Sequence, residues 1–190
     1  MRLLTITTLF PNATDPKHGI FVETRLKHFK NKYPDTELTV IAPIPWFPSK
    51  NPRFGSYASF SQTPKHEKRL GSDVYHPRYL VIPKVGMLLT PFFLAISILL
   101  CILKLQRQGK QYDLIDGHYL YPDGVAIALC SLWVKIPFVL TARGTDLNLI
   151  PLYTIPRRML CWASGRAKAL VTVCEALREA AINIGIPGTK

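Results

Sequence analysis

Short apolar segments with the pattern of buried strands alternate along this chain with longer segments of helical periodicity, and this alternation constrains the fold most. It implies right-handed crossovers and a mainly parallel sheet. The sequence therefore predicts an α/β class with a doubly wound sheet and helices on both faces. Strands are predicted at 2–7, 37–42, 74–82 (weak), 112–116, 138–141 and 169–173, and helices at 19–33, 88–108, 123–134, 156–164 and 175–184.

One domain accounts for the whole chain. A length of 190 residues is enough for one hydrophobic core and short for two. The segment 43–73 interrupts the alternation, since it is rich in proline, serine and aromatic residues and too long for a plain connector. We therefore predict one domain over 1–190 with an irregular, functional or mobile insertion at 43–73.

The charge balance limits the classes of partner. Lys and Arg number 24 against 12 Asp and Glu, a net charge of +12 that favours nucleic acid, an anionic membrane surface or a polyanionic substrate. The basic residues are scattered without aromatic platforms or a binding motif, which disfavours nucleic acid. Four well-separated cysteines indicate reduced thiols, mostly buried, and the short apolar N-terminus is typical of a strand. A cytoplasmic protein is the expectation.

A charge-free run of 19 residues, 85–103, lies between Lys84 and Lys104 and is long enough to span a membrane. Pro91 is expected to split it, leaving about twelve residues as a clean helix, the length of a buried helix in a soluble domain. The segments on either side also read as parts of one sheet. We therefore favour a helix of the domain. A true span at 85–103, and peripheral contact with a membrane surface, remain as alternatives.

Two loops are expected to face each other across one crevice. In a sheet of order 3-2-1-4-5-6, ligands bind at the carboxyl ends of the strands, between the first strand and the fourth. The loop after the first strand ends at Gly19, where backbone N–H groups can approach an anion or where a turn requires positive φ. The loop after the fourth, DGHYLYPDG, carries His118, which either does chemistry or bonds to a backbone carbonyl.

A third loop, TARGTDLNLIP, brings Arg143, Thr145 and Asp146 to the same edge. Arg143 and Asp146 either pair as a structural clamp or present donors and acceptors to a polar substrate. The Asp123 side chain is expected to act locally, near the start of its helix. Neither G-x-G-x-x-G nor a P-loop is present, which disfavours dinucleotide dehydrogenases and P-loop enzymes.

The order of four segments resembles the N-terminal domain of GT-B glycosyltransferases of family 4. These segments are FP…GIFVETR, DLIDGHYLYPDGVAIAL, PFVLTARGTDLN and AKALVTVCEALREAAINIGIP. The most specific parts are H-x-x-Y-P-D-G and T-x-R-G-T-D, and mainly 43–73 is left out. The chain departs from the family at Cys174, where serine is common, and at Gly19, where a glycine pair is common.

The resemblance implies a retaining, hexosyltransferase-like enzyme that moves a sugar from a nucleotide-sugar to a glycan or lipid-linked acceptor, in polysaccharide or glycolipid biosynthesis. It implies two Rossmann-like domains, of which this chain is the first, so that the nucleotide-sugar-binding C-terminal domain is its partner. The chain alone is then expected to be folded but inactive. Carried over to this sequence, the site residues are Gly19 at the donor diphosphate, His118 as the catalytic residue beside the sugar, and Arg143, Thr145, Asp146 and Tyr121 on the acceptor side.

No Asp-x-Asp motif, the metal site of the rival sugar-transferring fold, occurs in the sequence. Neither a metal nor another cofactor is therefore expected, because the nucleotide-sugar is a substrate. A non-catalytic Rossmann-like binding module is the alternative from a different functional class.

Overall fold

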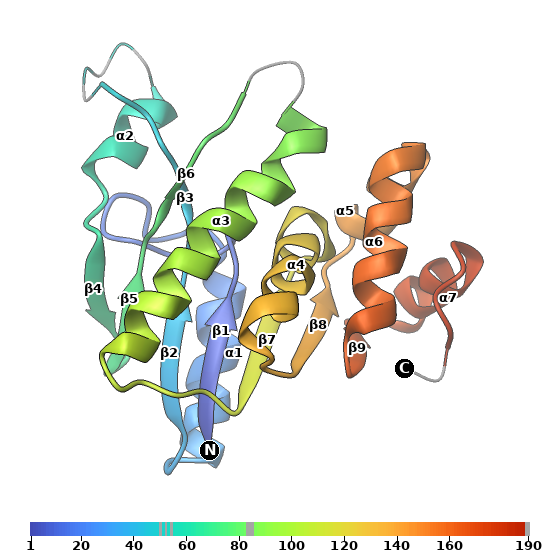
Figure 1. Cartoon of the computed structure of the whole chain (residues 1–190), viewed down its shortest axis with the longest axis horizontal. Coiled ribbons are helices and arrows are strands. Elements are labelled where there is room, and N and C mark those ends of the chain that lie inside the picture. The colour runs from blue at the N-terminus through green and yellow to red at the C-terminus, as the bar shows by residue number, and fades with distance from the viewer. Residues whose placement is uncertain (50, 52, 54, 83–85, 189–190) are drawn as a thin grey trace.

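The main sheet has seven strands in the order β4-β5-β2-β1-β7-β8-β9 (Figure 1). The computed structural model describes residues 1–49, 51, 53, 55–82 and 86–188. All neighbouring strands are parallel except β4 and β5, so the order without β4 is the expected 3-2-1-4-5-6. The predicted class is confirmed. The strands are β1 (Arg2–Ile6), β2 (Glu37–Ile41), β4 (His66–Arg69), β5 (Ser72–Tyr75), β7 (Leu114–His118), β8 (Phe138–Ala142) and β9 (Ala169–Thr172).

Helices cover both faces of the sheet. Figure 1 shows α3, α4 and α6 on one face and α1 on the other. Side chains alternate along each strand, so the neighbours Val40 and Ile41 of β2 enter two separate apolar cores, one under each helical layer. The helices are α1 (Ile20–Lys32), α2 (Ser56–Gln62), α3 (Gly86–Arg107), α4 (Val125–Val134), α5 (Thr145–Asn148), α6 (Thr154–Arg166) and α7 (Glu175–Asn183).

Helix α3 is continuous through Pro91, so the expectation that this proline splits the apolar run is wrong. Proline has no N–H to donate to the carbonyl four residues earlier, that of Met87. The hydroxyl of Tyr121 donates to this carbonyl instead, which satisfies the group that the proline leaves free. The described helix is long and apolar enough to cross a membrane, and only 28% of its most apolar window is buried in the domain. Lys84 and Val85 lie outside the described residues.

The segment predicted as irregular contains regular structure in its described part. Besides α2 and β4 it forms β3 (Ile44–Pro45), which pairs in parallel with β6 (Arg78–Tyr79) in a separate two-stranded sheet. The strand predicted over 74–82 accordingly divides into β5 and β6. Proline explains both the short pieces and the missed prediction, because Pro45 cannot donate to a strand ladder and Pro77 separates β5 from β6.

The four cysteines are free, but their burial differs from the expectation. Cys130 is buried, whereas Cys174 is exposed and the other two are half-buried. Burial raises the pKa of the Cys130 thiol to about 12. Only this thiol is therefore buried, as the sequence predicts for most of them.

Candidate functional site

His118 is the last residue of β7, and its side chain is completely buried among charged groups. Arg143 donates from Nη2 to Nδ1 of His118 over 2.9 Å. On the other side of the ring, Nε2 lies 3.2 Å from Oδ2 of Asp116 and 3.0 Å from Nη1 of Arg25. These partners assign Nδ1 as the acceptor and Nε2–H as the donor to Asp116. The histidine thus bonds to side chains and not, as the simpler interpretation had it, to a backbone carbonyl.

The electrostatics of this cluster favour a neutral histidine beside an ionised aspartate. Burial, with the nearby charges of Arg25 and Arg143, lowers the pKa of His118 in spite of Asp116. Burial alone would raise the pKa of the Asp116 carboxyl, but His118 and Arg25 outweigh it and the pKa is lowered. Arg25 and Asp116 form an ion pair of 2.7 Å. Two guanidinium groups and one carboxylate therefore leave an excess of positive charge at the strand end.

Two of these residues were missed by the sequence reading. Arg25 lies on α1, where the sequence analysis assigned it no role, yet it reaches across to β7. Asp116 was treated only as the end of a strand. Side chains two residues apart in a strand share one face, so an aspartate two places before His118 in an otherwise apolar strand was a usable signal. No local pattern distinguished Arg25 from the other bases of α1.

Arg143 places its guanidinium 4.8 Å above the ring of Phe21, near the start of α1. This cation–π contact joins the loop after β8 to the helix after β1. Arg143 is half-buried, and the Arg25 side chain is 43% exposed. Both cations are therefore accessible at the carboxyl edge of β1, β7 and β8, next to the point between β1 and β7 where the topology places the ligand crevice.

Asp146 organises the backbone and does not pair with the Arg143 side chain. Its buried carboxylate accepts from the backbone N–H of Leu120 at 2.8 Å, of Gly144 at 2.7 Å and of Arg143 at 3.0 Å. The proposed Arg143–Asp146 side-chain clamp is wrong, because Asp146 binds the backbone while the guanidinium binds His118. Thr145, next to it, is exposed at the same edge.

Asp123 acts at long range, which corrects the expectation of a local role. Its carboxylate accepts from the backbone N–H of Thr8 at 2.6 Å and from the Thr8 hydroxyl at 3.0 Å. The bond joins the loop after β1 to the π-helical turn Leu120–Gly124 after β7. Burial raises the pKa of Asp123 to about 7. Asp123 therefore ties the two sides of the crevice together.

Gly19 has a structural reason to be glycine. Its φ is 62° at the N-terminus of α1, and a Cβ atom there would lie 2.3 Å from the backbone carbonyl carbon and oxygen of Leu9. No side chain fits at such distances, so the interpretation as a turn glycine with positive φ is confirmed. The role of Gly19 at a donor diphosphate stays a prediction.

Tyr121 lies under α3, where its hydroxyl donates a hydrogen bond to the Met87 carbonyl. The exposed fraction of Tyr121 is 3%. Its side chain therefore faces the interior, so an acceptor-side role for it stays a prediction. Tyr119 is the tyrosine at the strand end. It is half-buried and has a φ of 75°, a conformation that bulky residues rarely adopt. Strained backbone of this kind is often found at functional sites, and no sequence pattern pointed to it.

Three buried polar atoms in this cluster have no hydrogen-bond partner among the described residues. They are Oδ1 of Asp116, Oγ1 of Thr141 and Nε of Arg143. Buried polar atoms without partners are uncommon and need an explanation such as water, an ion or a functional role. No group of three or more His, Cys, Asp and Glu side chains in the described ranges is arranged to hold a metal ion.

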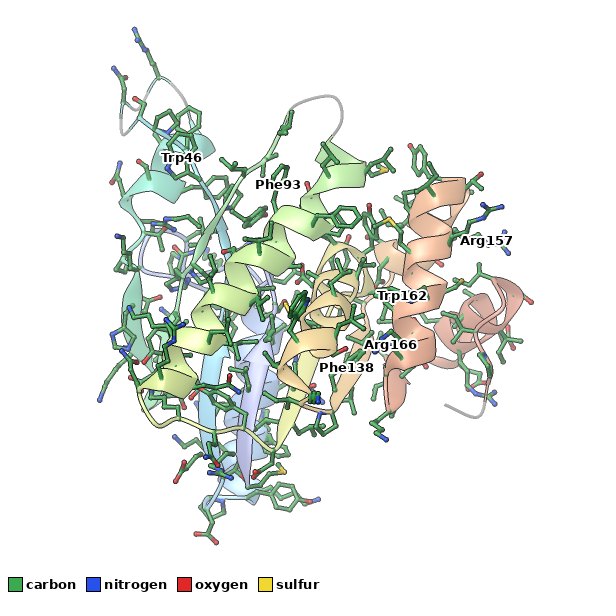
Figure 2. The ribbon with its side chains drawn as sticks, viewed as in Figure 1. Trp46, Phe93, Phe138, Arg157, Trp162 and Arg166 are labelled. Carbon is green, nitrogen blue, oxygen red and sulfur yellow. The ribbon has the colours of Figure 1, made fainter. Side chains whose placement is uncertain are left out.

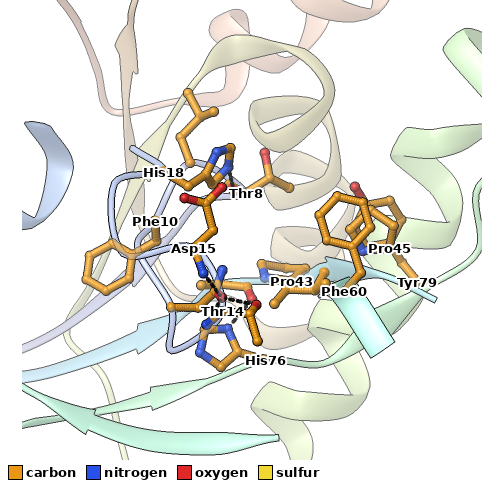
Figure 3. Close-up of a pocket in the computed structure, with 14 residues that line it drawn as sticks. Thr8, Phe10, Thr14, Asp15, His18, Pro43, Pro45, Phe60, His76 and Tyr79 are labelled. Carbon is orange, nitrogen blue, oxygen red and sulfur yellow. Dashed lines mark hydrogen bonds between the residues drawn. The ribbon is translucent and has the colours of Figure 1, made fainter. Parts of the chain in front are cut away.

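A cavity of about 320 Å³ opens beside the cluster, at the carboxyl ends of β1, β2 and β5 (Figure 3). One wall is the loop after β1, and the other is built by apolar residues of the segments after β2 and β5 and by Phe60 of α2. His76 lies at its base, held by the Ala42 carbonyl and by Glu67. The lining residues are Thr8, Leu9, Phe10, Asn12, Thr14, Asp15, His18, Ala42, Pro43, Ile44, Pro45, Phe60, His76 and Tyr79.

Comparison with known proteins gives one family and one curated relative. The family described as Glycosyltransferase Family 4 matches residues 37–190. The protein TuaC of Bacillus subtilis (strain 168), provisionally named a teichuronic acid biosynthesis glycosyltransferase, is 33% identical over 185 residues. The match covers 95% of this chain and 46% of TuaC, so the chain spans about half the length of this relative.

Solved structures share the fold at low identity. A UDP-GlcNAc 2-epimerase from Methanocaldococcus jannaschii has a TM-score of 0.55 at 13% identity, with 100% of this chain and 44% of that one covered. Alr3699/HepE of Anabaena, in complex with UDP-glucose, has a TM-score of 0.54 at 15% identity, with 100% and 42% covered. At these identities the likeness establishes the Rossmann-like fold and nothing further.

Proposed function

Because the chain belongs to glycosyltransferase family 4, we propose that it is the acceptor-side half of a retaining GT-B enzyme. The enzyme transfers a sugar, hexose-like in type, from a nucleotide-sugar to a glycan or lipid-linked acceptor in polysaccharide or glycolipid biosynthesis. The observation that carries this proposal is the group of two accessible guanidinium groups around His118 at the strand-order switch point. The nucleotide-sugar-binding domain is the partner that completes the cleft.

The chemistry of sugar transfer explains the positive charge. The bond between the anomeric carbon of the sugar and the phosphate oxygen breaks as the acceptor oxygen forms its bond to the same carbon. The nucleoside diphosphate leaves, negative charge grows on its phosphate oxygens, and the leaving phosphate takes up the proton of the acceptor hydroxyl. Arg25 and Arg143 are positioned to stabilise this charge, and Asp116 holds Arg25 in place at 2.7 Å. Positive charge that is preorganised at a partly dry strand end stabilises a developing anion more strongly than the same charge in water.

His118 acts next to these cations. In the described conformation its ring has no exposed surface, and both nitrogens are engaged. Direct contact with the sugar thus requires Arg143 to release Nδ1 when the donor binds. We propose this exchange, after which His118 orients the sugar and stabilises its developing charge. A histidine that only positioned the arginines would instead change the donor KM more than kcat.

The neighbouring cavity is the proposed acceptor subsite. Its volume of about 320 Å³ lies at the small end of ligand pockets, and its wall offers the rings of Phe60 and Tyr79 to an apolar sugar face. The side chains of Asn12 and Thr14 lie on the polar side. The chain's charge of +12, together with the provisional name of TuaC as a teichuronic acid biosynthesis glycosyltransferase, favours an acidic glycan as acceptor.

A chimera tests the proposal. Residues 1–190 replace the matching part of TuaC, and release of UDP is measured with UDP-glucose, UDP-GlcNAc and other UDP-sugars in the presence of glycan acceptors. UDP donors come first because a protein of similar fold is solved with UDP-glucose. Arg25→Ala should raise the donor KM about tenfold or more, since a charge-assisted contact is lost. Lys27→Ala, two residues away on α1 and exposed, is the matched control and should change nothing.

The same experiment distinguishes an enzyme from the alternative, a non-catalytic binding module. A folded chimera that binds UDP-sugar without transferring the sugar to any acceptor would favour a binding module. The isolated 190-residue chain should bind nucleotide-sugar weakly or not at all, because we propose that the donor is held largely by the second domain. Micromolar binding of UDP-glucose to the isolated chain by calorimetry would contradict this division of roles.

A further inference from the structure

The outward face of α3 is apolar along its length, the reverse of an ordinary surface helix. Exposed side chains recur at intervals of about four residues and form one stripe. We call this the α3 stripe, and it consists of Leu88, Leu89, Phe92, Ile96, Leu100 and Leu103. The inward face has Leu94, Ile98 and Ile102, all completely buried against the sheet. The helix is thus anchored in the domain on one side and presents hydrocarbon to the surroundings on the other.

The apolar surface continues onto α4. Trp133 is 76% exposed, and together with Phe92 and Ile96 it lines a shallow apolar groove between the two helices. Figure 1 shows α3 and α4 side by side on the same face of the sheet. Tryptophan combines an apolar ring with one polar N–H and is enriched where proteins meet the membrane interface.

A cationic cavity of about 390 Å³ borders the other flank of α3. Lys65, Arg78 and Lys104 line it, with no carboxylate among its lining residues, and Leu100 of the α3 stripe forms part of its wall. Ser97 also lines it and is only 8% exposed, and its Oγ has no hydrogen-bond partner among the described residues. Arg78 donates from Nη2 to the Thr63 carbonyl, while its Nη1 has no partner among the described residues. The cavity therefore offers two lysines, one guanidinium nitrogen and one unused hydroxyl to an anion.

The sequence around α3 is basic as well. Residues 74–112 contain five Lys and Arg and no Asp or Glu. A second copy of this chain is a poor occupant, because a symmetric contact would bring two such basic surfaces together. A membrane-spanning α3 is a poor alternative as well, because it would have to leave the sheet and expose Leu94, Ile98 and Ile102. An anionic bilayer surface complements both the hydrocarbon and the charge.

We infer that this face docks on an anionic lipid bilayer, with the α3 stripe and Trp133 entering the boundary between headgroups and acyl chains and a lipid phosphate occupying the cationic cavity. Such a helix lies in the plane of the interface, and its binding combines apolar burial with attraction to anionic lipids. This inference does not rest on the proposed sugar transfer, since the α3 stripe, Trp133 and the three cations lie outside the crevice, and only His76 lines both the cationic cavity and the cavity of about 320 Å³.

Flotation of the 190-residue chain with vesicles tests the inference. Vesicles of phosphatidylglycerol and phosphatidylcholine should carry the chain at low salt, and pure phosphatidylcholine should carry at least tenfold less. High salt should weaken the binding to anionic vesicles. Ile96→Glu/Leu100→Glu should reduce partitioning about tenfold or more, and Lys65→Glu/Lys104→Glu should remove the preference for phosphatidylglycerol. The matched controls, Ile182→Glu on α7 and Lys27→Glu/Lys32→Glu on α1, should float like the unmodified chain.

Quenching of tryptophan fluorescence by lipids brominated on the acyl chains shows which part of the protein enters the bilayer. A chain that keeps Trp133 alone, with Trp46→Phe and Trp162→Phe, should be quenched strongly. A chain that keeps Trp46 alone should be quenched less, since Trp46 follows β3, by α2 (Figure 2), and belongs neither to the α3 stripe nor to α4. Soluble inorganic phosphate at millimolar concentration should not abolish flotation, which separates a lipid from a free anion.

Several results would overturn the inference. One is equal binding to neutral and anionic vesicles, and another is no binding to either. A third is a dimer in light scattering that Ile96→Glu/Leu100→Glu dissociates, because a second copy would then cover the stripe. Resistance to extraction by alkaline carbonate would indicate a true span. Circular dichroism of each variant distinguishes lost binding from a lost fold.

Discussion

The two sides of the crevice differ in how their polar groups are used. At the ends of β7 and β8 the charged side chains bond to one another, as Arg25, Asp116, His118 and Arg143 do. Asp116 and His118 are buried, whereas the two arginines remain accessible. At the ends of β1, β2 and β5 there is open space of about 320 Å³, lined mainly by apolar and neutral side chains. The charged side is therefore prepared for anion chemistry, while the neutral side offers room for a ligand. Several residues of the sequence motifs hold the loops of the two sides together. Substituting these residues tests how the two sides differ.

The largest expected effect is the loss of the loop clamp on the charged side. Asp146→Ala leaves three backbone N–H groups, one buried and two partly buried, without their acceptor, so it should lower the free energy of unfolding by about 3–5 kcal/mol. Urea unfolding measures this. Thr145→Ala, exposed and adjacent, is the control and should cost about 0.5 kcal/mol or less. A loss below about 1 kcal/mol in Asp146→Ala would show that the carboxylate is not a clamp.

Gly19 tests the loop that walls the neutral side. Gly19→Ala places a Cβ 2.3 Å from the Leu9 backbone at positive φ, and should cost about 2–4 kcal/mol of unfolding free energy. Gly109→Ala also has positive φ, but nothing lies within 4 Å of its Cβ, so its cost should be about 1 kcal/mol. An equal loss of unfolding free energy in the two variants would mean that the close approach of residue 19 to the Leu9 backbone does not affect stability.

Asp123, which joins the two sides, should make stability depend on pH. Its folded pKa of about 7 lies above the ordinary value, so between pH 4 and 7 the native state keeps a proton that the unfolded state releases. Stability should then fall as pH rises through this window, by up to about 1.4 kcal/mol per pH unit, and level off above pH 7. The lowered pKa of His118 opposes this trend below pH 6.5.

The contribution of the Asp123 carboxyl to the pH dependence of stability is measured by comparing the unmodified chain with a variant that lacks this carboxyl. Asp123→Asn removes the titrating carboxyl, so the stability of the unmodified chain minus that of the variant should decrease as pH rises from 5 to 7. Thermal unfolding at several pH values provides the comparison. A difference that is flat across this range would place the folded pKa of Asp123 near its ordinary value.

The smallest expected effect concerns Tyr121, a motif residue that faces away from the crevice. Tyr121→Phe removes the donor to the Met87 carbonyl and should cost about 1–2 kcal/mol. Pro91→Ala supplies a backbone N–H to the same carbonyl, so the double variant should recover part of the loss. Denaturant unfolding of the four proteins in this cycle measures the coupling, and strict additivity would refute the link between Tyr121 and Pro91.

Periodicity was enough to predict the mainly parallel sheet, and the common order 3-2-1-4-5-6 that was assumed for it is observed when β4 is left aside. The central strands are buried on both faces, so their apolar runs are strong signals, and His118 and Gly19 follow from where these runs end. Local patterns did not reveal the strands within 43–73, because strands of two residues, bounded by proline, are too short to show a periodicity. They also did not show that the helix continues through Pro91, since Tyr121, which donates the hydrogen bond that the proline cannot, is 30 residues away in the sequence.

Side-chain partners were the least predictable part of the site. Arg25 and Asp116 are 91 residues apart, and Thr8 and Asp123 are 115 apart. Neither pair leaves a spacing pattern, because the sheet brings its members together only after folding. The sequence thus located the carboxyl edge and several residues on it. It did not determine which of them face the crevice and which support its walls.

The proposed role of the charged side is tested most directly by the turnover of the chimera with His118→Ala at saturating UDP-sugar. We predict that kcat falls about 10²- to 10³-fold, as expected when a preorganised stabilising group is lost, while circular dichroism and the unfolding midpoint show a folded protein. Unchanged turnover in the folded variant would contradict the account and leave His118 as a structural part of the strand end.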